Sequence, residues 1–193
     1  MIDIDKYTIL KKHISTLKKT SEDIHDGRPV YMTDSQAEVI DFDAVKDEYI
    51  KELHIRGDAP KSNDALMIRS DTEAVFIEFK NGNMTKKLQF DIRKKIYDSI
   101  LMLTDIIGKN ISYTRDHLDY ILVYNAKNDD KEDIDPKSEY RESRSRDKID
   151  ETILEYGGQR HIKFKLEMFQ RYCFRNVYTY TKEEFEARFA DKL

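Results

Sequence analysis

The chain has 193 residues, of which 39% are hydrophobic and 11% aromatic, and it contains only six glycines and three prolines. This composition excludes a disordered chain and favours one domain with a packed core. Charged residues make up 37%, yet the formal net charge is only −4. The overall charge therefore argues against nucleic-acid binding and leaves a local basic surface as the route to phosphates.

Cysteine usage and hydropathy indicate the cellular compartment in which the protein is expected. The one cysteine, Cys173, excludes an internal disulfide and a cysteine-based zinc site, and it fits a reducing environment. No apolar run approaches the roughly 20 residues that span a bilayer. The N-terminus carries acids where a signal peptide would be basic and then apolar. We therefore expect a cytoplasmic protein without a membrane partner.

The first predicted elements precede the centre of the chain. Residues 5–24 have apolar side chains at helical spacing, which predicts an amphipathic helix. Residues 37–42 predict a short strand, and residues 43–53 predict a second helix. The stretch 56–63, which contains Gly, Pro, Ser and Asn, predicts a loop.

The middle of the chain predicts a sheet. Two strands, 64–69 and 74–80, flank a short turn, and the periodic apolar residues of 85–108 predict a long helix that Gly108 ends. Residues 118–125 are apolar on both faces, which is typical of an internal strand. The order strand, strand, helix, strand predicts an α/β fold with a central mixed sheet flanked by helices.

The last third has a different character. Residues 126–147 are highly charged and predict a mobile loop. Three arginines in this loop are candidates for binding phosphates, although the interleaved acids also fit a solvated loop: Arg141, Arg144 and Arg146. An α/β extension follows, with a helix at 148–156, a strand at 161–164, a helix at 166–172, a strand at 174–180, and a final helix that Thr181 and Glu184 cap. We expect one domain over residues 1–193, with its core at about 5–125 and the extension at 148–193.

Charged residues interrupt the apolar hairpin sequence NDALMIRSDTEAVFIEFKNG, residues 63–82. Because side chains alternate along a strand, Glu78 and Lys80 are expected on one face and Phe79 on the other. A three-residue loop gives three cross-strand pairs: Arg69 with Glu73, Leu66 with Phe76, and Asp64 with Glu78. A two-residue loop would shift the pairing by one residue and separate the two acids.

Two adjacent carboxylates raise each other's pKa unless a cation compensates their charge. Carboxylate oxygens suit Mg²⁺, which keeps several waters, and the carbonyl of Phe79 is a further possible ligand. Such an ion acidifies a water and screens the charge on a scissile phosphate. Lys80 would position the nucleophile or stabilise charge in the transition state. Asp64, Glu78 and Lys80 therefore predict hydrolysis of phosphodiesters.

This arrangement resembles the PD-(D/E)XK nuclease superfamily. Asp64 and the Glu78-Phe79-Lys80 triplet match its acid and acid-x-Lys elements, and the predicted order over residues 5–125 matches its restriction-endonuclease-like α-β-β-β-α-β core, with helix 43–53 inserted. The proline that usually precedes the first acid is Asn63 here. The last third has no assigned counterpart.

The resemblance implies roles for particular residues. Asp64 and Glu78 would bind Mg²⁺, for which Mn²⁺ would substitute, and Lys80 would assist catalysis. Gln89 would match a glutamine that some members carry on the following helix, and Arg93 would contact nucleic acid. The expected protein is a Mg²⁺-dependent nuclease that cleaves DNA and works as a homodimer with one site for each strand. The resemblance leaves restriction, phage defence, toxin and repair roles open.

Two alternatives stay open. The superfamily also contains members without activity that serve as protein- or nucleic-acid-binding modules. Independently of the resemblance, Glu78 and Lys80 would form a solvated salt bridge if they lay on an edge strand, although the cost of burying charge on an apolar strand favours the metal site. Two further acid-x-Lys triplets, at Asp129 and Asp135, lie in the charged loop. Glycine-rich phosphate loops are absent from the sequence, so no nucleotide cofactor is expected.

Overall fold

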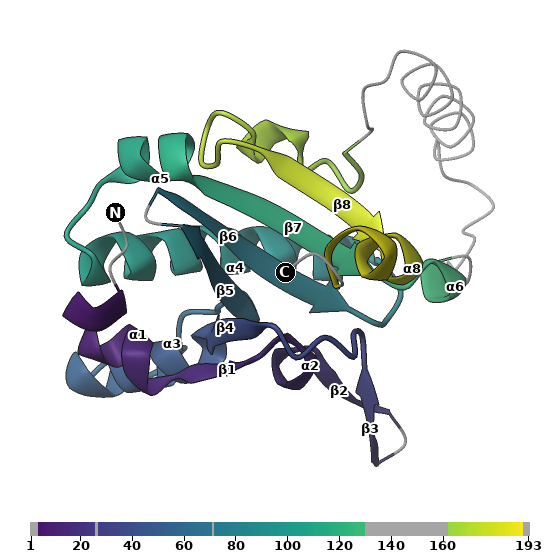
Figure 1. Ribbon diagram of the computed structural model, residues 1–193, viewed down its shortest axis with the longest axis horizontal. Coiled ribbons are helices and arrows are strands. Elements are labelled where there is room, and N and C mark those ends of the chain that lie inside the picture. The colour runs from purple at the N-terminus through teal and green to yellow at the C-terminus, as the bar shows by residue number, and fades with distance from the viewer. Residues whose placement is uncertain (1–3, 26, 71, 130–161, 191–193) are drawn as a thin grey trace.

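The computed structural model describes residues 4–25, 27–70, 72–129 and 162–190 (Figure 1). In chain order, their elements are η1 (Ile4–Lys6), α1 (Thr8–Lys12), β1 (Ile14–Thr16), α2 (Leu17–Thr20), β2 (Glu22–His25), β3 (Arg28–Tyr31), β4 (Glu38–Asp41), α3 (Phe42–Glu52), β5 (Ala65–Ser70), β6 (Glu73–Lys80), α4 (Lys86–Ile106), α5 (Ile111–His117), β7 (Leu118–Tyr124), α6 (Ala126–Asp129), η2 (Glu167–Phe169), β8 (Val177–Thr181), α8 (Lys182–Phe185) and the π-helical turn η3 (Glu186–Ala190).

A six-stranded mixed sheet forms the centre of the described fold, in the order β1-β4-β5-β6-β7-β8. Neighbouring strands from β1 to β6 pair antiparallel, whereas β6, β7 and β8 run parallel to one another. Strands β2 and β3 form a separate hairpin. The predicted α/β fold with a mixed sheet flanked by helices is confirmed at this level.

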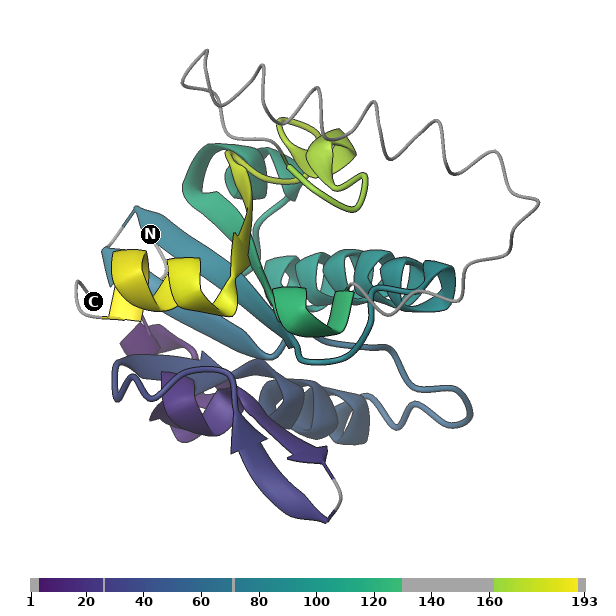
Figure 2. The same cartoon turned by 90° about the vertical axis from the view of Figure 1, so that its right-hand side faces the viewer.

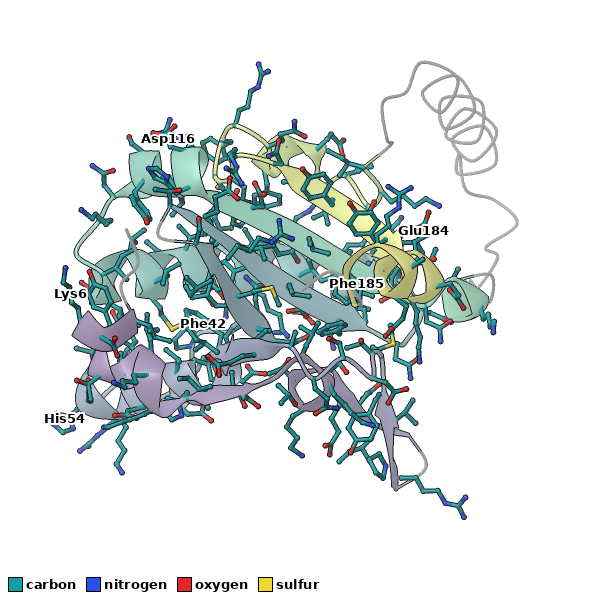
Figure 3. The ribbon with its side chains drawn as sticks, in the orientation of Figure 1. Lys6, Phe42, His54, Asp116, Glu184 and Phe185 are labelled. Atoms are coloured by element: carbon teal, nitrogen blue, oxygen red, sulfur yellow. The ribbon has the colours of Figure 1, made fainter. Side chains whose placement is uncertain are left out.

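Each face of the sheet carries its own hydrophobic core. On one face, α1, α3, α4 and the segment around η2 contribute to a cluster that includes Phe42 and Phe76. On the other face, Phe185 of α8 and Leu17 of α2 belong to a smaller cluster. Figure 2 shows α3 and α4 on one side of the sheet and α8 on the other, and Figure 3 labels Phe42 and Phe185.

The middle of the chain folds as predicted. The helix expected at 85–108 is α4, which Thr85 caps at its start by accepting a hydrogen bond from the backbone of Leu88. Gly108 follows it with a left-handed φ of 61°, a conformation that glycine adopts without strain. All seven residues of β7 are buried, and β7 lies between β6 and β8. The helix predicted at 43–53 is α3.

The single helix predicted over 5–24 is wrong. The chain forms α1, crosses to the sheet edge as β1, which pairs Ile14 with Ile40 of β4, and then forms α2 and β2. Leu10 and Leu17 are both buried, but they belong to the two clusters on opposite faces of the sheet. One straight helix cannot bury side chains on both faces, so the apolar spacing reflects two short segments.

The predicted hairpin register is confirmed in the middle of the strands and differs near the turn, and the β5–β6 pairing begins at Ala65 with Ile77, next to the two acids. Leu66 pairs with Phe76 as predicted. Glu73, however, pairs with Ser70 rather than with Arg69, because the register shifts between Ile68 and Ser70. Such an irregularity absorbs one residue and bends the strand.

The C-terminal part differs from the prediction in several places. Residues 162–164 of the strand predicted at 161–164 form no strand, and Phe164 and Lys165 have left-handed φ values of 61° and 56°. The helix predicted at 166–172 is reduced to η2, whereas α5 was not predicted. The strand at 174–180 is confirmed as β8, and so is the capping box of Thr181 and Glu184. Most of loop 126–147, including Asp135, and helix 148–156 lie outside the described residues.

The longest helix, α4, has 21 residues. No helix in the described part of the chain combines the length and the apolar character needed to cross a membrane.

Arg175 links β6 and β7 through ion pairs at the end of the sheet opposite Lys80. Its guanidinium donates to both carboxylate oxygens of Asp119, at 3.0 and 2.9 Å, and to Glu73 at 2.6 Å. The Asp119 side chain is only 4% exposed. Removing one partner of a buried ion pair leaves a charge without compensation, so we expect Arg175→Met to lower the free energy of unfolding by about 3 kcal/mol.

Urea denaturation measures this loss. Glu73→Gln is the control, because Glu73 is 43% exposed and its contribution should stay below about 1 kcal/mol. Equal losses in the two variants would contradict the central role of Asp119.

Candidate functional site

The three residues singled out by the sequence lie at one end of the β5–β6 hairpin. Asp64 immediately precedes β5. Glu78 and Lys80 lie at the C-terminal end of β6, where Lys80 is the last residue of the strand. Phe79 belongs to the opposite core, where its ring meets Phe185 at 5.8 Å. The predicted alternation of Glu78 and Phe79 is confirmed. The edge-strand interpretation is wrong, because β6 lies between β5 and β7.

The segment before Asp64 is tied to helix α4. The backbone amide of Lys61 donates to Asp98 at 2.7 Å, and its ammonium binds Asp91 at 2.7 Å. The amide of Asn63 donates to the hydroxyl of Ser99 at 2.8 Å. These bonds fix the segment along α4 and place Asp64 between that helix and β6.

A lysine from α4 joins the two acids. The ammonium of Lys95 lies 2.9 Å from Oδ1 of Asp64 and 2.7 Å from Oε1 of Glu78. The ammonium of Lys80 lies 2.5 Å from the same oxygen of Glu78. The other carboxylate oxygen of Asp64 accepts a hydrogen bond of 2.6 Å from the backbone amide of Phe79. Two carboxylates and two ammonium groups therefore form one cluster.

Burial sets the electrostatics of this cluster. The side chain of Glu78 is fully buried, whereas those of Lys80 and Lys95 are 19% and 18% exposed. Burial, and then the negative charge of Asp64, raise the pKa of Glu78, and the two lysines oppose this change. Burial by itself lowers the pKa of Lys95, but the charges of Glu78 and Asp64 and the hydrogen bonds to them raise it. Lys95 is therefore a stable ammonium.

Several buried polar atoms near the cluster have no hydrogen-bond partner among the described residues. They include Oε2 of Glu78 and the hydroxyl of Tyr120. Burial, followed by the charges of Glu78 and Asp64, raises the pKa of Tyr120 far above its ordinary value, so its phenol stays neutral. A buried polar group without a partner costs about 1–3 kcal/mol. Atoms of this kind indicate a place for a ligand, an ion or water.

Lys95 was not predicted as a site residue. A signal for it exists in the sequence, because position 95 follows Ile92 by three residues and precedes Ser99 by four, and both of these are buried. A lysine on the buried stripe of a helix must find an anionic partner or reach solvent. Which anion it meets depends on how α4 lies across the sheet.

The remaining predicted residues lie elsewhere or outside the described chain. The side-chain amide of Gln89 donates to the carbonyl of Met84 at 3.1 Å. Arg93 donates to the carbonyl of Phe164 at 3.5 Å, and its Nε is buried without a partner among the described residues. The three loop arginines, Arg141, Arg144 and Arg146, are outside the described residues.

Asp64 and Glu78 are the two acids that this cluster offers to a metal ion. No group of three or more His, Cys, Asp or Glu side chains that could hold a metal ion occurs in the described ranges. An ion at Asp64 and Glu78 would thus take its other ligands from backbone carbonyls, water or substrate, as Mg²⁺ commonly does.

The one cysteine is a core residue. Cys173 is buried, and burial raises the pKa of its thiol to about 11. Because the thiolate is the reactive form, we expect Cys173 to react with a disulfide reagent at pH 8 about 100-fold more slowly than an exposed thiol. Absorbance of the released thiol measures the rate. Unfolding in guanidinium should restore fast labelling, and rapid reaction of the folded protein would contradict the burial.

Comparison of the chain with protein-family models, with curated proteins and with solved structures gives no match.

Proposed function

We propose that this protein is a Mg²⁺-dependent nuclease that hydrolyses phosphodiester bonds in DNA. The observation that carries the proposal is the convergence of Asp64 and Glu78 on one cation position, Lys95 Nζ, at 2.9 and 2.7 Å. Lys80 lies beside them at 2.5 Å from Glu78. Acids distant in the chain are brought together at considerable cost in burial, and metal-assisted chemistry is a use that offsets this cost.

The donor set fits a divalent ion. The oxygens of Asp64 and Glu78 are hard ligands of the type that Mg²⁺ and Mn²⁺ prefer, and Oε2 of Glu78 is buried without a partner in the described part of the chain. When bound, the ion would polarise a phosphoryl oxygen and lower the pKa of a water.

The protein groups then have distinct roles. Asp64 and Glu78 would hold the ion, and the amide of Phe79 fixes the orientation of Asp64. Lys80 is partly exposed and stabilises negative charge on the phosphate in the transition state. Water gives up a proton to solvent and attacks phosphorus in line with the 3′ oxygen, the bond to that oxygen breaks, the 3′ oxygen takes up a proton from a water molecule, and the product keeps a 5′-phosphate. Gln89, Arg93 and the loop arginines remain proposed contacts to the nucleic acid.

The strand order supports the proposal. Three consecutive antiparallel strands, β4, β5 and β6, are followed by α4 and by β7, which runs parallel to β6. This order resembles the β-β-β-α-β order expected for a restriction-endonuclease-like core, with α3 and α5 as insertions and the short α1 in place of a long first helix. A homodimer and a role in bacterial or phage defence belong to the same proposal.

A second candidate is a binding module of the same fold without activity. Lys95 favours it, because its ammonium already offsets the charges of Asp64 and Glu78 without a metal ion. Such a cluster would serve only to hold α4 against the hairpin.

Cleavage assays distinguish the two candidates. The protein is incubated with plasmid, linear, single-stranded and RNA substrates in Mg²⁺, in Mn²⁺ and with a chelator. We expect metal-dependent cleavage of DNA that Asp64→Asn abolishes and that Lys94→Met, a charge control on the same helix, leaves unchanged. Cleavage that survives Asp64→Asn would place the activity in another centre, and no cleavage with any substrate would favour the binding module.

A further inference from the structure

We propose that Lys95 is the resident cation of this site and that a divalent ion binds by displacing its ammonium. The inference rests on the proposed function, which assigns the ion to Asp64 and Glu78. It adds that the ammonium of Lys95 competes with the metal ion for the two acids. This competition is then what controls how tightly the metal ion binds.

The geometry makes the two cations mutually exclusive. Lys95 Nζ contacts one oxygen of each acid, at 2.9 and 2.7 Å. A magnesium ion would sit about 2.1 Å from the same oxygens, so it would fall on or beside the ammonium. Two positive charges at such a distance repel strongly in a partly buried site. The lysine therefore has to leave before the ion can be shared by both acids.

The structure supplies a reason for the exchange to proceed. Lys95 uses only Oε1 of Glu78, whereas Oε2 has no partner among the described residues. A hydrated divalent ion keeps several waters, and one of them can donate a hydrogen bond to Oε2. The flexible four-carbon stem lets the ammonium swing away without movement of the helix, and the side chain is already 18% exposed.

Charge couples this exchange to the substrate. Without metal, the acids Asp64 and Glu78 and the lysines Lys80 and Lys95 sum to zero formal charge. A divalent ion brings two positive charges while the ammonium of Lys95 leaves, so the site gains one net positive charge, which is compensated when a phosphate of a nucleic acid arrives. Binding of the ion and of the nucleic acid should therefore reinforce each other, and by linkage each raises the affinity for the other equally. The ion alone should bind weakly.

Titration calorimetry with Mn²⁺ tests the inference in the full chain. We compare the wild type with Lys95→Met and Lys95→Gln, which remove the competing charge while keeping a side chain of similar length. Lys94→Met is the matched control, because it removes a charge from the neighbouring position, turned about 100° around the helix. Each titration is repeated with a nuclease-resistant phosphorothioate oligonucleotide. Two substitutions at position 95 guard against one variant failing to fold.

The expected result is Mn²⁺ binding about 10- to 100-fold tighter in both Lys95 variants, the range that changes next to metal ligands produce. Lys94→Met should bind like the wild type, and the oligonucleotide should tighten Mn²⁺ binding most in the wild type. Equal affinity in the wild type and the Lys95 variants, lost in Asp64→Asn, would overturn the inference and leave the metal site intact. Weaker binding in the Lys95 variants would overturn it as well. No binding in any variant would overturn both the inference and the proposed metal site.

Discussion

Glu78→Gln is expected to slow phosphodiester cleavage by about 10³-fold or more while the protein stays folded. Glu78 is fully buried and bound by both lysines of the cluster. The amide has almost the same shape but lacks the negative charge that holds a divalent ion. Loss of several kcal/mol of transition-state stabilisation by the ion corresponds to about a thousandfold in rate, because each 1.36 kcal/mol is a factor of ten. Single-turnover cleavage with excess enzyme measures the change.

The stability of the same variant is the necessary control. The amide costs less to bury than a carboxylate, but it leaves Lys80 and Lys95 with a weaker acceptor. These effects oppose each other, so we expect the free energy of unfolding to change by less than about 2 kcal/mol. Cleavage at the wild-type rate would show that Glu78 does not belong to the catalytic centre. Lost cleavage together with lost folding would leave Asp64→Asn as the deciding variant.

The acids could be predicted from the sequence because a hairpin is a local structure. Alternation along two adjacent strands and a short turn predict that Asp64 comes near Glu78; Leu66 pairs with Phe76 as that register requires, and both acids contact Lys95. The irregularity at the turn did not disturb this result, since it lies beyond Ile68. Periodicity likewise predicted α4, because its apolar stripe continues over several turns.

Lys95 could not be assigned in the same way. Its partners, Asp64 and Glu78, lie 31 and 17 residues away, and the contact depends on how α4 lies across the sheet. That placement depends on bonds such as Asn63 to Ser99, which no periodic pattern encodes. The helix predicted over residues 5–24 is wrong for a related reason. Its apolar residues fit one helix locally, but Leu10 and Leu17 serve different faces of the sheet.

The largest loss of stability is expected when the aromatic pair under the sheet is truncated. Phe42 of α3 and Phe76 of β6 are both fully buried, and their rings meet edge to face at 4.8 Å. Phe76 precedes Glu78 by two residues, so it lies on the same face of β6. We expect Phe42→Ala and Phe76→Ala each to lower the free energy of unfolding by about 3–5 kcal/mol through lost burial and a residual cavity.

A double-mutant cycle isolates the pair itself. The double variant should lose about 0.5–1.5 kcal/mol less than the sum of the single losses, because the edge-to-face contact is removed only once. Phe90→Ala is the matched control, since Phe90 lies on the outer side of α4 and is 67% exposed; its effect should stay within about 0.5 kcal/mol. Urea denaturation measures the wild type and all four variants. Strict additivity would show that α3 and β6 are stabilised independently.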